Sequence, residues 1–468
     1  STPAPSTRSM ACKAQTSGRI YLHSGPRTEL HEIIRQEYAR HQDRAVPRNT
    51  LRQAVQGMLD TFAYQNFDAA AGEYTNRCCR PPRETEMRPW RLVTEIGWTG
   101  GGVLAYPLVL CRDALGADAE APLAAAMSGE QLFDRIADAY NENSGLLNDL
   151  MAPNAAGSQV NGWWTGYGLV KDCHCAYTVG SAVHYLTKTM DYLHQNGKPC
   201  PAKWMDAAQK VLHTVMDLQR ADGAFGYTYS TQERKVLDWS GFAGCWFAPA
   251  LVYLYRLTGE ERCLHSAEKA LHYYHTFVKD LNCYGTPMDT WKAVDEEGNL
   301  AFMRGSRLLY EQTGKAEFLQ YMKDSAGYEF LWRYGYKTYP EHTPLNQGWS
   351  ACGGAVTSVS NPHIHPMGVI IDTDLRYLAR VTGDGYYASR AADSAAWMLQ
   401  CLELYPAATG YGRYGILSER WCPSDGLDVE RFSDGRPFSS WFSHNLWASA
   451  CVLEAACELL LEIEHKKG

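Results

Sequence analysis

Three aspartates lie just ahead of predicted helices and are candidates for acid–base chemistry. Asp238 lies in LDWSGFAG, Asp172 in GLVKDCHCAY and Asp289 in TPMDTWKAVDEEG. Cleavage of a bond between sugars needs a proton donor and usually a second carboxylate across that bond. Leu237 and Trp239 would partly desolvate Asp238, which raises the pKa of a carboxyl and suits a general acid. We therefore predict Asp238 as the general acid and Asp172 or Asp289 as its partner; capping of a helix N-terminus is the alternative role for Asp238 and Asp172.

The 14 tryptophans are distributed unevenly along the chain. Nine fall in or at the ends of the long segments that connect predicted helices: Trp90, Trp98, Trp163, Trp164, Trp239, Trp291, Trp349, Trp421 and Trp441. Such segments are usually polar and exposed, whereas flat aromatic rings on one rim can stack on the apolar C–H faces of sugars. We expect seven of them to contact substrate: Trp98, Trp163, Trp164, Trp239, Trp291, Trp349 and Trp421. The alternative is that they fill a core beneath the loops.

Two histidines alternate in the segment SNPHIHP, which spans residues 360–366. Side chains two positions apart in an extended segment point to the same side. We therefore predict that His363 and His365 hold substrate or carry a proton. Local packing is the alternative, and a metal site is disfavoured because no third and fourth ligand has a matching spacing.

The last long connecting segment, 403–441, combines tyrosine with arginine. We predict that Tyr411, Tyr414 and Arg420 contact substrate. Arginine binds a carboxylate through a two-pronged hydrogen bond, which would suit an acidic sugar. The alternative is that the arginines of this segment pair with the acidic residues near them.

Several classes of function are disfavoured. The chain has no P-loop, no GxGxxG after a strand, no GxSxG and no HExxH motif, and neither CHC at 173–175 nor CC at 78–79 has zinc-site spacing, so we expect no cofactor and no metal. A net charge of −8 disfavours nucleic-acid binding, and no apolar run approaches the roughly 20 residues that span a bilayer. The 15 scattered cysteines are interpreted as mostly reduced and buried, which favours a cytoplasmic protein; a secreted protein whose signal peptide has been removed is the alternative.

Helical periodicity dominates the chain, and no convincing series of alternating strands is present. It predicts a short helix at 29–41 and twelve more at 48–63, 98–114, 129–141, 174–195, 203–219, 242–258, 261–278, 297–313, 315–333, 366–382, 384–402 and 442–463. Three of these end in the turns Thr258-Gly259-Glu260, Thr313-Gly314-Lys315 and Thr382-Gly383-Asp384, each with glycine at the left-handed position that ends a helix. Their similar contexts indicate an internal repeat of a helical hairpin.

Six hairpins with short links at one end and long links at the other predict a closed ring. The helix that leads into each short turn is then the inner one, and the long loops gather on one face. The helix at 242–258 is apolar nearly all round, as a helix packed on both sides should be, whereas 261–278 carries charge on one side. We predict an all-α fold, an (α/α)6 toroid over 48–468, preceded by an arm and short helix over 1–47; an open solenoid is the alternative.

The stretch LDWSGFAGCWFAPALVYLYRLTGEERCLHSAEKAL combines an aspartate, an apolar helix, a Thr-Gly turn and an Ala-rich second helix. In this it resembles the six-hairpin, (α/α)6-toroid carbohydrate-active enzymes, and most of all the unsaturated glucuronyl hydrolases. The resemblance implies that Asp238 matches the functional aspartate that opens the third inner helix, and that Asp172 is the nearest match to the one that opens the second. Two features depart from that family: Lys171 stands where a histidine usually precedes the second aspartate, and WSGFAG replaces a Met-rich run.

Together these inferences predict a glycoside hydrolase that cleaves an oligosaccharide with a uronic acid at the cleaved end. One alternative is a toroid polysaccharide lyase, in which Tyr414 or Tyr411 would abstract the proton next to a uronate carboxyl. A second is a sugar epimerase. A third is a helical-repeat scaffold that binds a partner without any chemistry.

Overall fold

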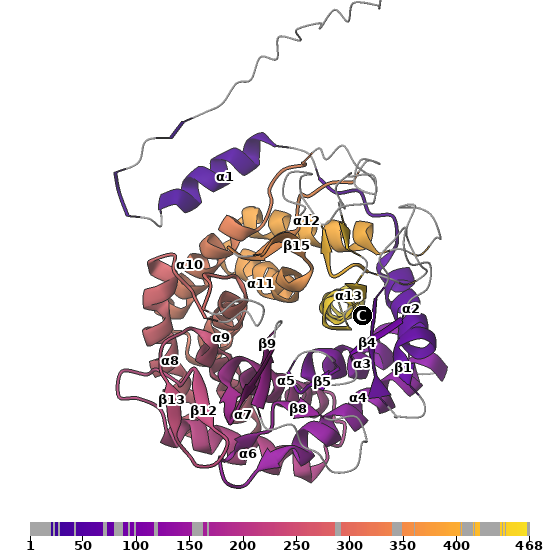
Figure 1. Ribbon diagram of the computed structural model, residues 1–468. Helices are drawn as coiled ribbons and strands as arrows, with labels where there is room; N and C mark the ends of the chain where they lie inside the picture. The colour runs from indigo at the N-terminus through magenta and orange to yellow at the C-terminus, as the bar shows by residue number, and fades with distance from the viewer. Residues whose placement is uncertain are drawn as a thin grey trace, which may run out of the picture.

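The structure is a computed structural model. It describes residues 20–21, 24–26, 29–41, 44–68, 73–78, 88–91, 94–97, 100–116, 120–151, 162–165, 168–285, 292–338, 349–359, 361–402, 404, 415, 417–421, 440–441, 443–444 and 446–465. Within these ranges, no helix is both long and apolar enough to cross a membrane. Two concentric rings of helices make up most of the molecule (Figure 1).

The inner ring consists of α3 (Gly102–Leu115), α5 (Ala176–Gln195), α7 (Phe247–Thr258), α9 (Glu297–Thr313), α11 (Asp372–Thr382) and α13 (Leu446–His465). The outer ring consists of α2 (Leu51–Thr61), α4 (Glu120–Asp138), α6 (Ala202–Asp217), α8 (Glu261–Lys279), α10 (Ala316–Trp332) and α12 (Gly385–Cys401). Each inner helix contacts the next and α13 contacts α3, so the ring closes (Figure 1). The predicted (α/α)6 toroid is confirmed, and α1 (Leu30–Arg40) lies outside it against α10.

The helix boundaries differ from the predicted ones by a few residues in most cases. The largest difference is in α4, which begins at Glu120 rather than near residue 129. A 3-10 turn at Ala243–Trp246 leads into α7, and another at Met367–Ile371 leads into α11. A π-helical turn at Phe62–Asn66 continues α2.

The repeated Thr-Gly turns join α7 to α8, α9 to α10 and α11 to α12. Gly259, Gly314 and Gly383 have φ values of 72°, 65° and 71°, a left-handed conformation that glycine adopts without steric cost. In each turn the threonine hydroxyl donates to the carbonyl four residues earlier, at 2.6–2.8 Å. The same hydroxyl accepts from the amide two residues later, at 3.2–3.3 Å. The Thr-Gly pair therefore ends these three inner helices in the same way.

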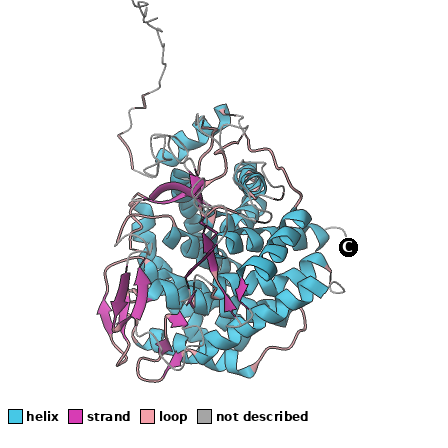
Figure 2. Cartoon of the chain, turned by 45° about the vertical axis from the view of Figure 1, so that its right-hand side comes forward, coloured by secondary structure: helices cyan, strands magenta, loops and turns pink. Residues whose placement is uncertain are grey.

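Short strands fill the connections that lead into the inner helices. β5 (Thr94–Glu95), β11 (Cys173–Cys175), β13 (Val236–Asp238), β15 (Asn361–His365) and β18 (Ser443–His444) each precede one of them. The others are β1 (Phe67–Asp68), β2 (Glu73–Tyr74), β3 (Asn76–Cys78), β4 (Arg88–Arg91), β6 (Tyr140–Asn141), β7 (Leu146–Leu147), β8 (Leu150–Met151), β9 (Gly162–Thr165), β10 (Gly168–Lys171), β12 (Thr228–Ser230), β14 (Ala355–Ser358), β16 (Arg420–Trp421) and β17 (Ser440–Trp441). They form small sheets, such as β11-β12-β13 and β14-β15-β16-β17 (Figure 2). Strands of two to five residues are too short for an alternating pattern to predict them.

Buried charges join the inner helices where the ring closes. Lys188 of α5 forms ion pairs with Glu454 and Glu458 of α13, the second at 2.8 Å. Tyr106 of α3 donates to Glu458 at 3.1 Å, and its ring centre lies 4.1 Å from the Lys188 ammonium. Burial opposes the charged form of Glu458, but Lys188 and Arg304 outweigh burial and lower the pKa of this carboxyl. One cluster therefore connects α3, α5 and α13.

We expect Lys188→Met to lower the free energy of unfolding by about 3–5 kcal/mol, because it removes the ion-pair partner of the buried Glu454 and of Glu458, which is only 12% exposed. Urea denaturation followed by circular dichroism measures the change. The control is Lys210→Met on the outer face of α6, where the side chain is 43% exposed and the expected change stays within about 0.5 kcal/mol. Equal effects of the two substitutions would contradict the structural role of the cluster.

Candidate functional site

The beginnings of the inner helices surround a small chamber. Its lining comes from five of the six inner helices or the residues just ahead of them: Gly97, Val103, Tyr177, Ser181, Tyr185, Trp246, Met367, Ile370 and Cys451. The cavity measures about 10 Å³, room for about one water molecule. Gly97 permits a close approach of the chain to α5, because a Cβ there would lie 2.4 Å from the Thr178 carbonyl oxygen. Side chains from most of the ring therefore converge at this point.

Glu297 supplies an acidic group beside the chamber. It is the first residue of α9 and is 4% exposed, and a helix N-terminus favours negative charge. Tyr177, which lines the chamber from α5, lies beside this carboxylate, and its hydroxyl also lies 3.8 Å from Met367 Sδ. Burial raises the pKa of Tyr177 well above its ordinary value, and the neighbouring Glu297 adds to the increase. The pair joins a carboxylate to a phenol in a site shielded from water, an arrangement that can hold and transfer a proton.

A second acidic cluster lies one residue ahead of α9. Glu296 is fully buried, and a Cβ on Gly368 would lie 2.4 Å from its Oε1 and 3.0 Å from Oε1 of Glu329. Arg333 binds Glu329 at 2.7 Å and Asp372 at 2.8 Å. Burial, and then repulsion from Glu329, raises the pKa of Glu296 well above its ordinary value. Glu296 therefore keeps its proton at pH values where an exposed glutamate has lost it.

A buried hydrogen-bond chain connects the loops ahead of α3 and α5. His174 Nδ1 lies 2.8 Å from Asp149 Oδ2, and His174 Nε2 lies 2.9 Å from the Ser144 hydroxyl. Asp149 also accepts from the Cys175 amide at 3.0 Å, and its carbonyl accepts from the Ile96 amide at 2.9 Å. Each of these three residues is 1% exposed, so substrate cannot reach the Ser144 hydroxyl as it reaches the serine of a Ser-His-Asp hydrolase. The chain of hydrogen bonds holds the two loops in register.

The structure places Asp238 at the end of β13, where its side chain is 33% exposed. Lys292 Nζ lies 2.6 Å from the Asp238 carboxylate, 2.9 Å from the Ser240 hydroxyl and 4.8 Å from the centre of the Tyr227 ring. Leu237 is 50% exposed, so the desolvation of Asp238 by Leu237 that we predict from the sequence is not found. The site therefore holds an ion-paired, half-buried carboxylate rather than an apolar pocket around an acid.

Asp172 also differs from its expected setting. It lies exposed between β10 and β11 with a left-handed φ of 60°, and β11 separates it from the start of α5. A tight change of direction between two strands explains this conformation, which aspartate tolerates better than most residues.

Three of the predicted sugar-stacking tryptophans belong to the core. Trp349 and Trp421 stack with ring centres 6.0 Å apart and are 3% and 2% exposed. The Trp349 indole donates to Cys401 Sγ at 3.4 Å. Trp163 on β9 is 2% exposed. Large aromatic rings gain most from burial, and these three pack beneath the loops instead of forming an open wall.

The other residues that we predict to contact substrate differ in how deeply they are buried. Trp239 is half-buried, with its ring centre 5.2 Å from the Arg220 guanidinium. His365 is 4% exposed and stacks on Trp447 of α13 at 5.9 Å, whereas His363 is half-buried. The remaining predictions lie outside the described residues or side chains: Asp289, Trp98, Trp291, Tyr411 and Tyr414, and the side chains of Trp164 and Arg420.

Sequence reasoning missed Glu297 and Tyr177. The signal for Glu297 is the run DEEG at 295–298, which ends the same motif that contains Asp289. Acidic residues are common in the first turn of any helix. The run alone therefore does not show which of its acidic side chains faces the middle of the ring of helices.

We expect Glu296→Gln to change how stability depends on pH. Because folding raises the pKa of Glu296 above its ordinary value of 4.5, its contribution is present at low pH and is lost as the pH rises. The variant should therefore gain stability relative to the parent by up to about 1.4 kcal/mol per pH unit above that value. Urea unfolding at steps between pH 5 and 8 measures the difference. Glu317→Gln, on an exposed position of α10, should show no such gain; equal curves for both variants would refute the assignment.

No protein-family model and no curated protein matches the chain. The similar proteins described next are solved structures. A cellobiose 2-epimerase from Bacillus thermoamylovorans B4167 is 12% identical, with a TM-score of 0.55, over 92% of this chain and 99% of that one. A family 76 glycoside hydrolase from a bovine Bacteroides thetaiotaomicron strain is 12% identical, with a TM-score of 0.57, over 89% and 78%. An unsaturated glucuronyl hydrolase specific for heparin is 12% identical, with a TM-score of 0.50, over 89% and 98%. The chain shares the (α/α)6-toroid fold of these enzymes.

Proposed function

We propose that the protein is a carbohydrate-active enzyme that hydrolyses a glycosidic bond of an oligosaccharide at the mouth of the ring. The observation that carries this proposal is the Glu297–Tyr177 pair, a buried carboxylate and phenol beside the chamber where the inner helices begin. The matched solved structures, which include an epimerase and glycoside hydrolases, support a saccharide as the substrate.

In this proposal Glu297 exchanges a proton with the glycosidic oxygen, and Tyr177 holds its carboxyl group in position. Asp238, a half-buried carboxylate that forms an ion pair with Lys292, is the partner carboxylate in this proposal. A second carboxylate across the bond can activate water or attack the sugar carbon. The chamber has room for about one water molecule, so the sugar ring would lie above it, on the side of the loops.

We further propose a uronic acid at the cleaved end of the substrate. The fold is shared with an unsaturated glucuronyl hydrolase, which supports this choice. The segment 403–441 also contains four arginines, which suit recognition of a carboxylate: Arg413, Arg420, Arg431 and Arg436.

A sugar epimerase is the second candidate, because a cellobiose 2-epimerase matches the fold over nearly its whole length. Epimerisation moves a proton at one carbon, and the buried Glu297–Tyr177 pair could carry that proton. Hydrolysis creates a new reducing end for each bond cleaved, whereas epimerisation creates none. A lyase would instead produce a conjugated double bond that absorbs ultraviolet light.

We expect Glu297→Gln to reduce kcat on an active saccharide by at least about 100-fold, because it removes the group that exchanges the proton. A screen of neutral and acidic oligosaccharides by reducing-end assay and by proton NMR identifies the substrate and the reaction. Asp238→Asn should also reduce kcat. The matched control is Asp206→Asn on the outer face of α6, which is 65% exposed and should keep full activity. Full turnover by the Glu297 variant would remove the basis of the proposal.

A further inference from the structure

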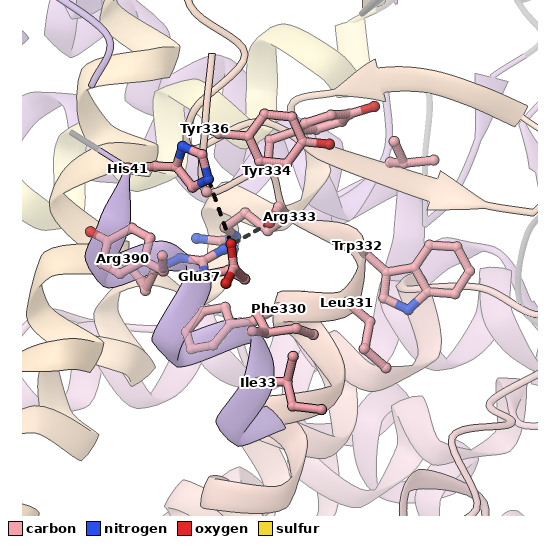
Figure 3. Close-up of a pocket in the computed structure, with 14 residues that line it drawn as sticks. Ile33, Glu37, His41, Phe330, Leu331, Trp332, Arg333, Tyr334, Tyr336 and Arg390 are labelled. Carbon is pink, nitrogen blue, oxygen red and sulfur yellow. Dashed lines mark hydrogen bonds and ion pairs between the residues drawn. The ribbon is translucent and has the colours of Figure 1, made fainter. Parts of the chain in front are cut away.

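A cleft of about 530 Å³ lies outside the ring, between α1 and the segment that follows α10 (Figure 3). Its volume falls within the range of small-molecule sites. One wall is the face of α1 that carries Ile33 and Glu37, together with His41 just after it, and the other is the segment from Phe330 to Tyr336. Neither wall contributes to the chamber.

Polar contacts anchor α1, and Ile34 also packs against the core. None of its residues is buried. Arg35 binds Asp384 through two hydrogen bonds of 2.7 and 2.9 Å, and Tyr38 donates to Asp393 at 2.5 Å. The buried Arg390 guanidinium lies 4.8 Å from the Tyr38 ring centre. The helix is therefore fixed as a wall, yet it does not fill the space that it borders.

Aromatic rings form the opposite wall. Tyr336 is 46% exposed, and its ring lies edge-on to Tyr334 with centres 5.4 Å apart. Trp332 of the same segment is half-buried, and Figure 3 shows its ring apart from those of Tyr334 and Tyr336. Such rings offer flat apolar faces to a ligand that is itself a ring with C–H faces.

Polar groups that suit hydroxyls stand beside the rings. Figure 3 shows Glu37 turned toward His41, and their nearest atoms, Oε2 and Nε2, are 3.9 Å apart. The His41 ring centre lies 5.8 Å from that of Tyr336. A carboxylate accepts hydrogen bonds, and a neutral imidazole both donates and accepts them. Sugar hydroxyls match this combination.

The charges of the cleft favour a neutral ligand over an acidic one. Arg333, at its floor, already binds Glu329 and Asp372 and also donates to the Gly368 carbonyl at 2.7 Å. Arg390 is fully buried and donates to the Arg333 carbonyl at 2.7 Å. Among the described lining residues, the other polar side chains that border the cleft include Glu37 and His41. Glu37 is 31% exposed, forms an ion pair with Arg40 and accepts from the Tyr21 hydroxyl, and its carboxylate suits a hydroxyl rather than an anion.

We infer that this cleft is a second saccharide site, which binds one ring of a neutral saccharide by stacking on Tyr336 and by hydrogen bonds to Glu37 and His41. Binding of a saccharide in this cleft does not depend on which reaction takes place at the chamber. A site on the outside of the ring would keep an oligosaccharide close to the enzyme while another part of it is processed.

Isothermal titration of the full chain with cellobiose and mannobiose, and with glucuronic acid as the acidic probe, tests the inference. We expect a neutral disaccharide to bind, and Tyr336→Ala and His41→Ala each to weaken that binding by about fivefold or more. The matched control is Tyr255→Ala, a half-buried tyrosine on α7, which should leave binding unchanged. Melting curves check that each variant folds.

Glu297→Gln should keep the binding that Tyr336→Ala loses, which separates this site from the proposed catalytic one. The inference is overturned if no neutral disaccharide binds, if the Tyr336 and His41 variants bind as the parent does, or if glucuronic acid is preferred.

Discussion

Lys188 lies where the last inner helix meets the first two, and its ammonium is enclosed by two glutamates and a tyrosine ring. An ion cluster of this kind contributes more to the choice of one arrangement than to net stability, because any shift that separates the partners leaves buried charges unpaired. Tyr106, Tyr185 and Lys188 all contact the acids of α13. In the same contact region the Cys111 and Cys457 sulfurs lie 3.8 Å apart. These groups fix how the ring closes.

The closure of the ring in turn determines which loop residues lie close together. The inner helices begin around one chamber, so the residues just ahead of each helix become neighbours although they are far apart in sequence. Small sheets and buried hydrogen bonds then hold the loops, as Asp149 does when it binds His174, Cys175 and Ile96. The Glu297–Tyr177 pair is a consequence of this geometry, since the two residues come from α9 and α5, which are not adjacent in the ring.

The helices, the short turns and the closed ring could be predicted because each follows from local rules. A threonine followed by a left-handed glycine ends three of the inner helices, and α7 is apolar on nearly every side. The loops follow no such rule. Trp349 and Trp421 look like an exposed rim in the sequence, yet they stack on each other in the core across 72 positions. Lys292 is paired with Asp238, from a loop 54 positions earlier. Only the three-dimensional arrangement determines such long-range partners.

The central claim, that the reaction takes place where the inner helices begin, is tested most directly by a crystal structure of the Glu297→Gln variant soaked with an active oligosaccharide. We expect a sugar ring above the chamber, with its glycosidic oxygen within hydrogen-bond distance of the side chain at position 297. Sugar found only elsewhere on the molecule, with the side chains of the chamber unchanged, would contradict it.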